Sequence, residues 1–399
     1  MPRGEPATRR VMIVAGEASG DLHGGNLVAA LSRLNPDIEF FGIGGSRMRA
    51  AGVDTRVDIS ELAVMGLVEV LLHYRRLRGV LWQMQELLRS ERPDLLITVD
   101  YPGFNLRLAK TARELGIKVL HYISPQVWAW REHRVRTIAQ RVDMMAVLLP
   151  FELPFYEKHG VPVRFVGHPL VDSVKPGMER SEAQRLFGLD PSRKTVGLLP
   201  GSRRGELKRL MPVLLESAAL LRQRFPDLQL LLPLASSLNP QDLAAWLEPV
   251  PEQGENRYIS RQNGSLQIVV IEQHGYDVMQ CCDAIITASG TATLEVALMN
   301  IPMVIVYKIS PLTYAIARRM ISIPHVGLVN IVAGEPIAPE FIQHAARAGK
   351  IAAATARFLE DADHAQGTRK KLANIRQRLG KPGGSENVAR LALEMLDRE

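Results

Sequence analysis

Short apolar segments rich in Val, Ile and Leu alternate with amphipathic segments along the whole chain. Apolar runs bounded by turn residues predict buried strands, and apolar positions three or four residues apart predict helices between them. The predicted strands are residues 11–15, 39–42, 95–99, 118–122, 144–148 and 163–166, then 195–199, 228–232, 267–270, 284–287 and 303–307. Helical patterns such as 25–34, 81–90 and 106–115 lie between them. This alternation predicts an α/β fold of doubly wound parallel sheets with helices on both faces.

The chain has 399 residues, which is enough for two domains that each bury a core. Strand signals stop and turn residues cluster between Gly167 and Gly177, so we expect Rossmann-like domains at 1–170 and 171–380. The region from Pro339 reads almost wholly helical, and a break near Gly380 precedes a last helix within 381–399. We expect that helix to return to the first domain, and a ligand to bind between the halves at the carboxyl ends of the strands.

Composition narrows the class of protein. A net charge of +7 and a pI near 9.5 suit an anionic partner, for which nucleic acid, a membrane surface and a charged substrate are the options. The two cysteines, Cys281 and Cys282, are adjacent, which argues against a disulfide scaffold and favours a reducing compartment. No apolar run approaches the roughly 18 residues of a membrane-spanning helix, and the stretch 11–15 is too short for a signal-peptide core. We expect a protein that is soluble or bound at a membrane surface.

A glycine turn follows the predicted strand 195–199 and leads into a Leu-rich helical pattern. Backbone N–H groups at Gly201 and Ser202 would lie at the start of that helix, where they suit a phosphate, and Arg203 adds a fixed positive charge. A second small-residue turn follows the strand 284–287. Together the two turns predict a phosphorylated ligand held by backbone in the second half.

The second turn carries Gly290, Thr291 and Thr293, followed by Glu295. A carboxylate in this position can accept hydrogen bonds from both hydroxyls of a ribose, as acids do in nucleotide-binding folds. The alternative is an acid that only favours the first turn of its helix.

In the first half, the strand 11–15 ends in a glycine-rich turn that contains Glu17, Ser19 and Asp21. This turn lacks the GxGxxG spacing of a dinucleotide site and is weak evidence for a nicotinamide cofactor. Asp21 or Ser19 could instead cap the following helix, and for Asp21 the two interpretations are equal. For Glu17 we favour a role in the site.

Asp100 follows the buried run 95–99 and is a candidate general base for an acceptor hydroxyl. Capping of the helix that begins near Asn105 is the competing interpretation. The next strand leads into a loop with Trp128 and Trp130, rings that could cover a ligand or simply pack in the core.

A very apolar segment, 62–72, runs into an arginine cluster. Apolar groups beside arginines suit an anionic bilayer surface, and a buried helix is the equal alternative. The residues of this predicted membrane patch are Met65, Val68, Leu71, Leu72, Arg75, Arg76 and Arg78.

Metal-binding and common nucleophile signatures are absent from the sequence. There is no HExxH, CxxC, GxxxxGK[ST] or GxSxG, and the acid pair Asp361 and Asp363 lies in a charged helical stretch that we interpret as solvated surface. We expect neither a metal nor a cofactor.

Taken together, several motifs resemble those of one family, the lipid-A-disaccharide synthases. They occur in family order over roughly residues 11 to 345, and the set is far more specific than any one motif. The motifs are AGEASGD at 15–21, LAVMG at 62–66, VDYPGFN at 99–105, SPQVWAW at 124–130, LPFE at 149–152, VGHP at 166–169, LPGSR at 199–203 and SGTATLE at 289–295.

The resemblance implies an inverting glycosyltransferase of GT-B architecture that needs no bound metal. Its reaction would join UDP-2,3-diacylglucosamine to 2,3-diacylglucosamine 1-phosphate (lipid X), giving a β-1,6-linked lipid A disaccharide phosphate and UDP. By resemblance, Asp100 would take the acceptor proton, Arg203 would stabilise the diphosphate, and Glu17 with Ser19 would position sugar hydroxyls or the acceptor.

Asn330 matches the family's nucleotide-site Asn, and Gln343 lies where the family pattern resumes after two departures. These departures are Val329, where Pro is common, and Glu335, where Arg is common. The resemblance further implies a peripheral protein on the cytoplasmic face of the inner membrane, with no nucleic-acid partner. A homodimer is left open. The alternatives are an enzyme like UDP-N-acetylglucosamine 2-epimerase, another GT-B enzyme, or a non-enzymatic nucleotide-sugar sensor.

Overall fold

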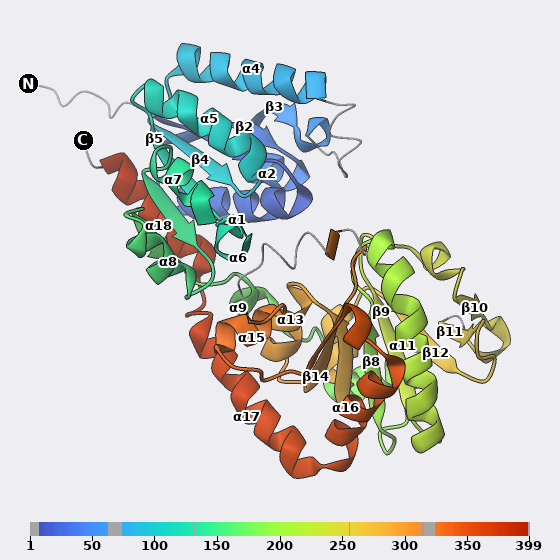
Figure 1. Ribbon diagram of the computed structural model, residues 1–399. Helices are drawn as coiled ribbons and strands as arrows, with labels where there is room; N and C mark the ends of the chain where they lie inside the picture. The colour runs from blue at the N-terminus through green and yellow to red at the C-terminus, as the bar shows by residue number, and fades with distance from the viewer. Residues whose placement is uncertain are drawn as a thin grey trace, which may run out of the picture. The chain divides into compact units, whose positions relative to one another are not determined.

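The chain forms two compact units, one of Met1–Pro169 with Gly380–Glu399 and one of Leu170–Leu379 (Figure 1). The computed structural model describes residues 8–62, 74–130, 132–254, 256–310, 313–314 and 324–397. Within those ranges no helix is both long and apolar enough to cross a membrane.

The first unit is built on a seven-stranded sheet in the order β3-β2-β1-β4-β5-β6-β7, and all its pairs are parallel. Its central strands are mainly apolar and mostly buried because helices cover both faces. The strands are β1 (Arg9–Ala15), β2 (Ile38–Gly44), β3 (Asp54–Asp58), β4 (Leu95–Val99), β5 (Lys118–Tyr122), β6 (Met144–Val147) and β7 (Val163–Phe165).

Successive residues of β1 enter opposite cores of this unit. Ile13 packs with Leu27 of α1 and Leu391 of α18 on one face, whereas Met12 packs with Met84 of α4 on the other. The last helix of the chain is therefore part of the first unit. The helices of this unit are α1 (Ala18–Leu34), α2 (Ser46–Ala50), α4 (Tyr74–Glu91), α5 (Pro102–Glu114), α6 (Val127–Trp130), α7 (Val135–Ala139), α8 (Glu152–Lys158) and α18 (Gly384–Asp397), with 3₁₀ turns at Ile59–Glu61 and Glu132–Arg134.

The second unit has an eight-stranded sheet in the order β10-β11-β12-β9-β8-β13-β14-β15. Its pairs are parallel except those that β11 makes with β10 and β12. The strands are β8 (Thr195–Leu199), β9 (Gln229–Leu234), β10 (Leu247–Pro249), β11 (Arg257–Ser260), β12 (Gln267–Glu272), β13 (Ala284–Ala288), β14 (Met303–Tyr307) and β15 (Glu340–Ile342).

Helices α11 and α16 bury one face of this sheet, where Leu214 and Ile351 pack against Leu198 of β8. The helices are α9 (Leu170–Ser173), α10 (Arg180–Leu186), α11 (Arg204–Arg224), α12 (Gly275–Gln280), α13 (Ala292–Leu298), α15 (Leu328–Ala333), α16 (Ala348–Glu360) and α17 (Ala362–Arg378), with 3₁₀ turns at Pro240–Leu243, Pro251–Gln253 and Gln343–Ala345.

The predicted fold class is confirmed: both units are parallel-sheet, Rossmann-like α/β structures. The prediction of an almost wholly helical region from Pro339 is wrong, because Glu340–Ile342 forms β15 beside β14. Sequence patterns also missed β3, β10 and β11. Each missed strand is five residues or shorter and mixes polar with apolar positions, so it lacks the long apolar run that marks a buried strand.

A buried carboxylate, Glu152, ties the loop after β5 to the start of α8. Its Oε1 accepts a hydrogen bond from Trp128 Nε1 at 3.0 Å, and its Oε2 accepts one from the Leu149 N–H at 3.1 Å. Beside it, Ser124 Oγ and the Tyr156 hydroxyl lie 2.8 Å apart. Burial raises the pKa of Glu152 to about 7, although hydrogen bonds from Leu149, Ser124 and Trp128 act in the opposite direction.

We expect the free energy of unfolding to fall between about pH 5 and pH 8 because of Glu152. Its folded pKa lies above the unfolded one, so the folded state binds more protons in this window and loses that advantage as the pH rises. A shift of this size corresponds to about 3 kcal/mol. Urea unfolding at both pH values should show the decline in the wild type and its loss in Glu152→Gln.

The matched control is Glu157→Gln, at an exposed position of the same helix. It should keep the wild-type pH dependence. If Glu152→Gln keeps it as well, the carboxyl of Glu152 does not titrate in this range.

Candidate active site

Asp100 lies at the carboxyl end of β4 in an unusual turn. Its φ is +48° and that of Tyr101 is +47°, a left-handed conformation that costs of order 1 kcal/mol or more for a residue with a side chain. The Asp100 N–H donates to the Tyr122 carbonyl at 2.9 Å. The buried Asn105 side chain donates to the carbonyls of Val99 and Asp100 at 3.2 and 2.7 Å. These bonds hold the turn, and the Asp100 side chain does not cap α5, whose N-cap residue is Tyr101.

The environment of the Asp100 carboxyl favours its protonated form. Partial burial raises its pKa most, the Tyr101 N–H lowers it, and the charge of Glu17 raises it further. Glu17 is an exposed residue directly before α1. Since Ala15 of β1 pairs with Val99 of β4, the two turns meet at one edge of the sheet. The structure therefore brings Glu17 and Asp100 to neighbouring turns at one edge of the sheet.

Gly16 makes the close approach of these two turns feasible. A Cβ on Gly16 would lie 2.3 Å from the Tyr101 ring, so only glycine lets the ring pack there. The Tyr101 hydroxyl also donates to the Leu62 carbonyl at 3.1 Å. Ser19 lies exposed in the first turn of α1 and makes no cap.

Asp21 is not open to a ligand. Its buried carboxylate accepts hydrogen bonds from the N–H groups of Gly45, Arg47 and Met48 at 2.6, 3.0 and 3.1 Å. Of the two interpretations of the sequence, capping is the correct one, but Asp21 caps α2 rather than its own helix. Such long-range capping leaves no trace in local sequence.

The buried histidines near this edge carry no positive charge at neutral pH. Burial lowers the pKa of His121 and of His168 to about 4, and the neighbouring His23 lowers that of His168 further. His121 Nδ1 lies 2.7 Å from Thr98 Oγ1. His121 and His168 are therefore poor candidates for holding an anion by charge.

In the second unit, the turn after β8 differs from the prediction of open N–H groups. Gly201 has a φ of +107°, and the N–H groups of Ser202 and Arg203 donate to Glu206 Oε2 at 2.9 and 3.3 Å. A Cβ on Gly201 would lie 2.2 Å from the same oxygen. The chain's own carboxylate thus occupies the cradle that the sequence predicts for a phosphate.

Beside this turn lies a pocket of about 190 Å³ at the carboxyl ends of β8, β13 and β14. Its lining includes three cationic side chains, Arg203, Arg209 and Lys308, together with Glu206 and Tyr307. Among the described residues none of the three cations forms an ion pair with a carboxylate. Burial raises the pKa of Tyr307, and the charge of Glu206 raises it further, whereas Arg203 and Arg209 lower it. The pocket is suited to an anion larger than one phosphate.

Sequence reasoning found Arg203 but missed Arg209 and Lys308. Lys308 directly follows β14, so the rule that polar residues at strand ends form sites could have identified it. Arg209 lies on α11 with no local signal, and only the fold brings it to the pocket.

The second predicted turn is used mainly for structure. Gly290 has a φ of +150°, and Thr291 is an exposed N-cap residue of α13 whose side chain makes no cap. The buried Thr293 hydroxyl donates to the Gly290 carbonyl at 2.8 Å and accepts from the Val329 N–H at 3.3 Å. Thr293 is therefore engaged within the protein.

Glu295 is partly buried beside Tyr276, whose hydroxyl donates to its Oε1 at 3.1 Å. Burial raises the pKa of Glu295, and the hydrogen bond from Tyr276 acts against that rise. One of its two oxygens has a protein partner in the described part of the chain, which leaves acceptor capacity for a ligand hydroxyl.

Asn330 and Gln343 are likewise engaged with the protein, contrary to ligand-binding roles for their side chains. The fully buried Asn330 amide bonds Ala338 through both its oxygen and its nitrogen and also donates to Glu340. Gln343 accepts from the Ile309 N–H and donates to its carbonyl. Both side chains fix loops beside the site.

The two departures from the family pattern are accommodated. Val329 is fully buried in α15. Glu335 forms an ion pair with Lys371 at 2.5 Å.

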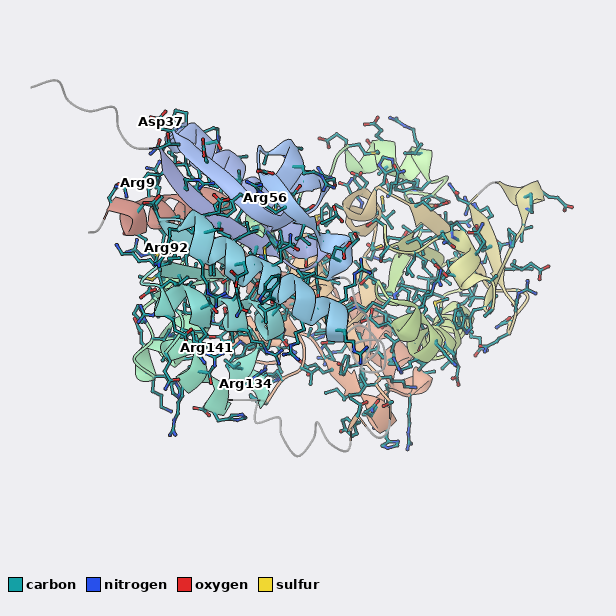
Figure 2. All side chains as sticks on the ribbon, turned by 90° about the horizontal axis from the view of Figure 1, so that it is seen from above. Arg9, Asp37, Arg56, Arg92, Arg134 and Arg141 are labelled. Atoms are coloured by element: carbon teal, nitrogen blue, oxygen red, sulfur yellow. The ribbon has the colours of Figure 1, made fainter. Side chains whose placement is uncertain are left out.

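Of the predicted membrane patch, Met65, Val68, Leu71 and Leu72 lie outside the described residues. The structure describes the arginines: Arg76 pairs with Glu61, whereas Arg75 and Arg78 are exposed on α4. Figure 2 looks onto α4, which lies in front of the first unit's sheet, with Arg92 just beyond its end. Trp82, one turn after Arg78, is 64% exposed, and sequence reasoning did not single it out.

In the described ranges no group of three or more His, Cys, Asp or Glu side chains could hold a metal ion. Cys281 and Cys282 are both buried and unpaired by a disulfide.

Known structures share the fold at low sequence identity. UDP-GlcNAc 2-epimerase from Neisseria meningitidis bound to UDP-GlcNAc aligns with a TM-score of 0.62 and 14% identity, covering 96% of this chain and 100% of that one. CalG4, the calicheamicin glycosyltransferase, aligns with a TM-score of 0.61 and 15% identity, covering 98% and 99%. At this identity the likeness establishes the GT-B fold and does not separate epimerases from transferases.

Relatives of higher sequence identity distinguish between an epimerase and a transferase. The lipid-A-disaccharide synthase of Geobacter metallireducens is 56% identical over 396 residues, which is 99% of this chain and 100% of that protein. The enzyme of the same name from Nitrosococcus oceani is 50% identical over 389 residues, 98% of this chain and 97% of that protein. A family model described as Lipid-A-disaccharide synthetase matches residues 11–394. The chain therefore belongs to the lipid-A-disaccharide synthase family of glycosyltransferases.

Proposed function

We propose that this glycosyltransferase moves the sugar of UDP-2,3-diacylglucosamine to the 6-hydroxyl of 2,3-diacylglucosamine 1-phosphate and releases UDP. The family membership supports lipid A disaccharide synthesis over the epimerase-like and sensor alternatives. The observation that carries the assignment of roles is that the two units hold site groups of opposite charge. A candidate base, Asp100, lies in the first unit, and a pocket with three cations lies in the second.

The reaction is a single displacement at the anomeric carbon. Asp100 takes the proton of the acceptor 6-hydroxyl while the hydroxyl oxygen bonds to that carbon. The bond from the same carbon to the diphosphate oxygen breaks, its electron pair leaves with UDP, and the configuration inverts. The raised pKa of Asp100 makes its carboxylate a stronger base than an exposed aspartate. Glu17 supports this by keeping that pKa high, and Ser19 lies exposed near it to position the acceptor.

The leaving diphosphate gains negative charge as the bond breaks. Arg203, Arg209 and Lys308 are arranged around one pocket and stabilise that charge. Glu295 accepts hydrogen bonds from the ribose hydroxyls through its remaining capacity, next to the backbone of Gly290 and Thr291. Thr293, Asn330 and Gln343 act as positioning residues, because their side chains hold the surrounding loops.

Replacement of the base should abolish transfer without weakening nucleotide binding. We expect Asp100→Asn to lower the transfer rate by at least about 100-fold and to leave the UDP dissociation constant within about twofold of the wild type. Disaccharide formation from radiolabelled acceptor and UDP titration calorimetry measure the two quantities. Asp94→Asn, at the opposite end of β4, is the matched control and should stay near wild-type activity. Wild-type turnover in Asp100→Asn would rule out this base.

The charge of Glu17 should set the acidic side of the pH profile. Transfer requires ionised Asp100, so the rate falls as the pH drops through the pKa of that carboxyl. Since Glu17 raises this pKa, Glu17→Gln should move the acidic limb of kcat/KM to lower pH. A pH–rate profile of both proteins measures the shift. An acidic limb that stays at the same pH or moves to higher pH in Glu17→Gln would contradict the effect of Glu17 on the pKa of Asp100.

The membrane role is assigned to α4. Arg75, Arg78 and Trp82 fall three, four and seven residues apart on its exposed stripe, an arrangement that suits an anionic bilayer surface. Both proposed substrates carry acyl chains and reside in a membrane, so the enzyme would meet them at a bilayer surface. This supports a peripheral location on the cytoplasmic face of the inner membrane.

We expect Arg78→Glu combined with Trp82→Ser to weaken binding to phosphatidylglycerol vesicles by at least about tenfold, since each basic residue near an anionic surface contributes about 1 kcal/mol. Sedimentation with vesicles measures the binding. Arg89→Glu, at the other end of α4, changes charge equally and should have a smaller effect. Equal binding of all three proteins would remove α4 from the membrane contact.

A further inference from the structure

Glu206 is a charged group that the reaction scheme does not use. Glu206 is the third residue of α11, and its Oε2 accepts hydrogen bonds from the N–H groups of Ser202 and Arg203. The turn is itself fastened from the neighbouring loop, where Ser237 Oγ donates to the Ser202 carbonyl at 2.6 Å. Glu206 also lines the cationic pocket. Glu206 therefore both binds the turn and lines the pocket in which the diphosphate would bind.

The net charge of the pocket matches that of a UDP-sugar better than that of free UDP. Three cations, Arg203, Arg209 and Lys308, and one carboxylate, Glu206, leave a net charge of +2. A diphosphate that is esterified at both ends, as in a UDP-sugar, carries two negative charges. Free UDP gains a third as its terminal phosphate ionises above about pH 6. The pocket with Glu206 therefore balances the donor, and without Glu206 it would balance the product.

We propose that Glu206 is a resident anion that occupies the backbone cradle after β8, offsets one cation of the pocket, and so favours the donor over released UDP. The inference rests on the proposed diphosphate role of this pocket. A phosphate that entered the cradle would have to displace the carboxylate, so the diphosphate is held by the three cationic side chains instead. Repulsion between Glu206 and the third charge of UDP assists departure of the product.

Glu206→Gln tests this role because the amide oxygen still accepts an N–H while the charge is lost. We expect UDP to bind at least about fourfold more tightly, which is the effect of removing one charge roughly 5 Å away even at the dielectric constant of water. The gain should shrink as salt rises from about 50 to 500 mM. The affinity for an unreactive UDP-sugar should rise less, since that ligand lacks the third charge. Titration calorimetry on the full chain measures all three.

Two further variants separate charge from turn support. Glu206→Asp keeps the charge but shortens the side chain, so UDP should bind no more tightly than to the wild type. Glu216→Gln removes an exposed charge from the same helix and should leave UDP binding unchanged. A purely structural role of Glu206 predicts weaker UDP binding in both the Gln and the Asp variants, with a lower melting temperature, and that outcome would overturn the inference.

The proposed function and this inference fail in different ways. If Arg203→Ala and Lys308→Ala bind UDP as tightly as the wild type, the pocket is not the diphosphate site. If those two variants lose UDP affinity but Glu206→Gln binds UDP with unchanged or lower affinity, the pocket role stands and the resident-anion role is wrong.

Discussion

Backbone N–H groups in loops and at helix starts need partners, and this chain supplies several of them from its own carboxylates. Asp21 accepts three such N–H groups, and Asp277, Glu340 and Glu206 accept two each. A charged acceptor makes a stronger hydrogen bond than a neutral one. These loops, among them the turns after β2 and β8, are therefore held within each unit by the protein itself, which is a condition for holding reactive groups in place.

These acids are taken up by backbone N–H groups, and the charged groups that remain for binding or catalysis differ between the two units. The first unit keeps two carboxyl groups, Asp100 and Glu17, and the pKa of Asp100 is raised mainly by burial and further by the charge of Glu17. The second unit keeps cations around the pocket that contains Arg203. Proton removal needs a base of raised pKa, and departure of a diphosphate needs positive charge. The two demands conflict if they fall on one cluster, because cations would lower the pKa of the base. In this chain the candidate base and the cations belong to different units.

The sequence predicts the fold well because long apolar runs in regular alternation leave few other architectures. It fails for β15, a three-residue strand whose existence depends on pairing with β14 rather than on its own residues. The roles of the site residues likewise depend on partners that are distant in the sequence. Asp21 and Asp100 both lie in turns that follow a buried strand, yet Asp21 accepts hydrogen bonds from three distant N–H groups and Asp100 has a raised pKa. Local sequence cannot distinguish them, because the deciding partners come from Gly45 and its neighbours.

The turn at Asp100 explains why a strained conformation persists there. Glycine would relieve the left-handed φ of Asp100 and Tyr101, but it would remove the carboxyl and the ring. The ring fills the space above Gly16, and its hydroxyl bonds the Leu62 carbonyl, just before the segment that leads to α4. The strain is thus offset by packing and hydrogen bonds that hold the Asp100 turn against the glycine turn after β1 and against Leu62 at the end of the 3₁₀ turn Ile59–Glu61. The proposed role of Asp100 as a base depends on such a fixed turn, because a base must be held in one orientation to take a proton from a bound hydroxyl.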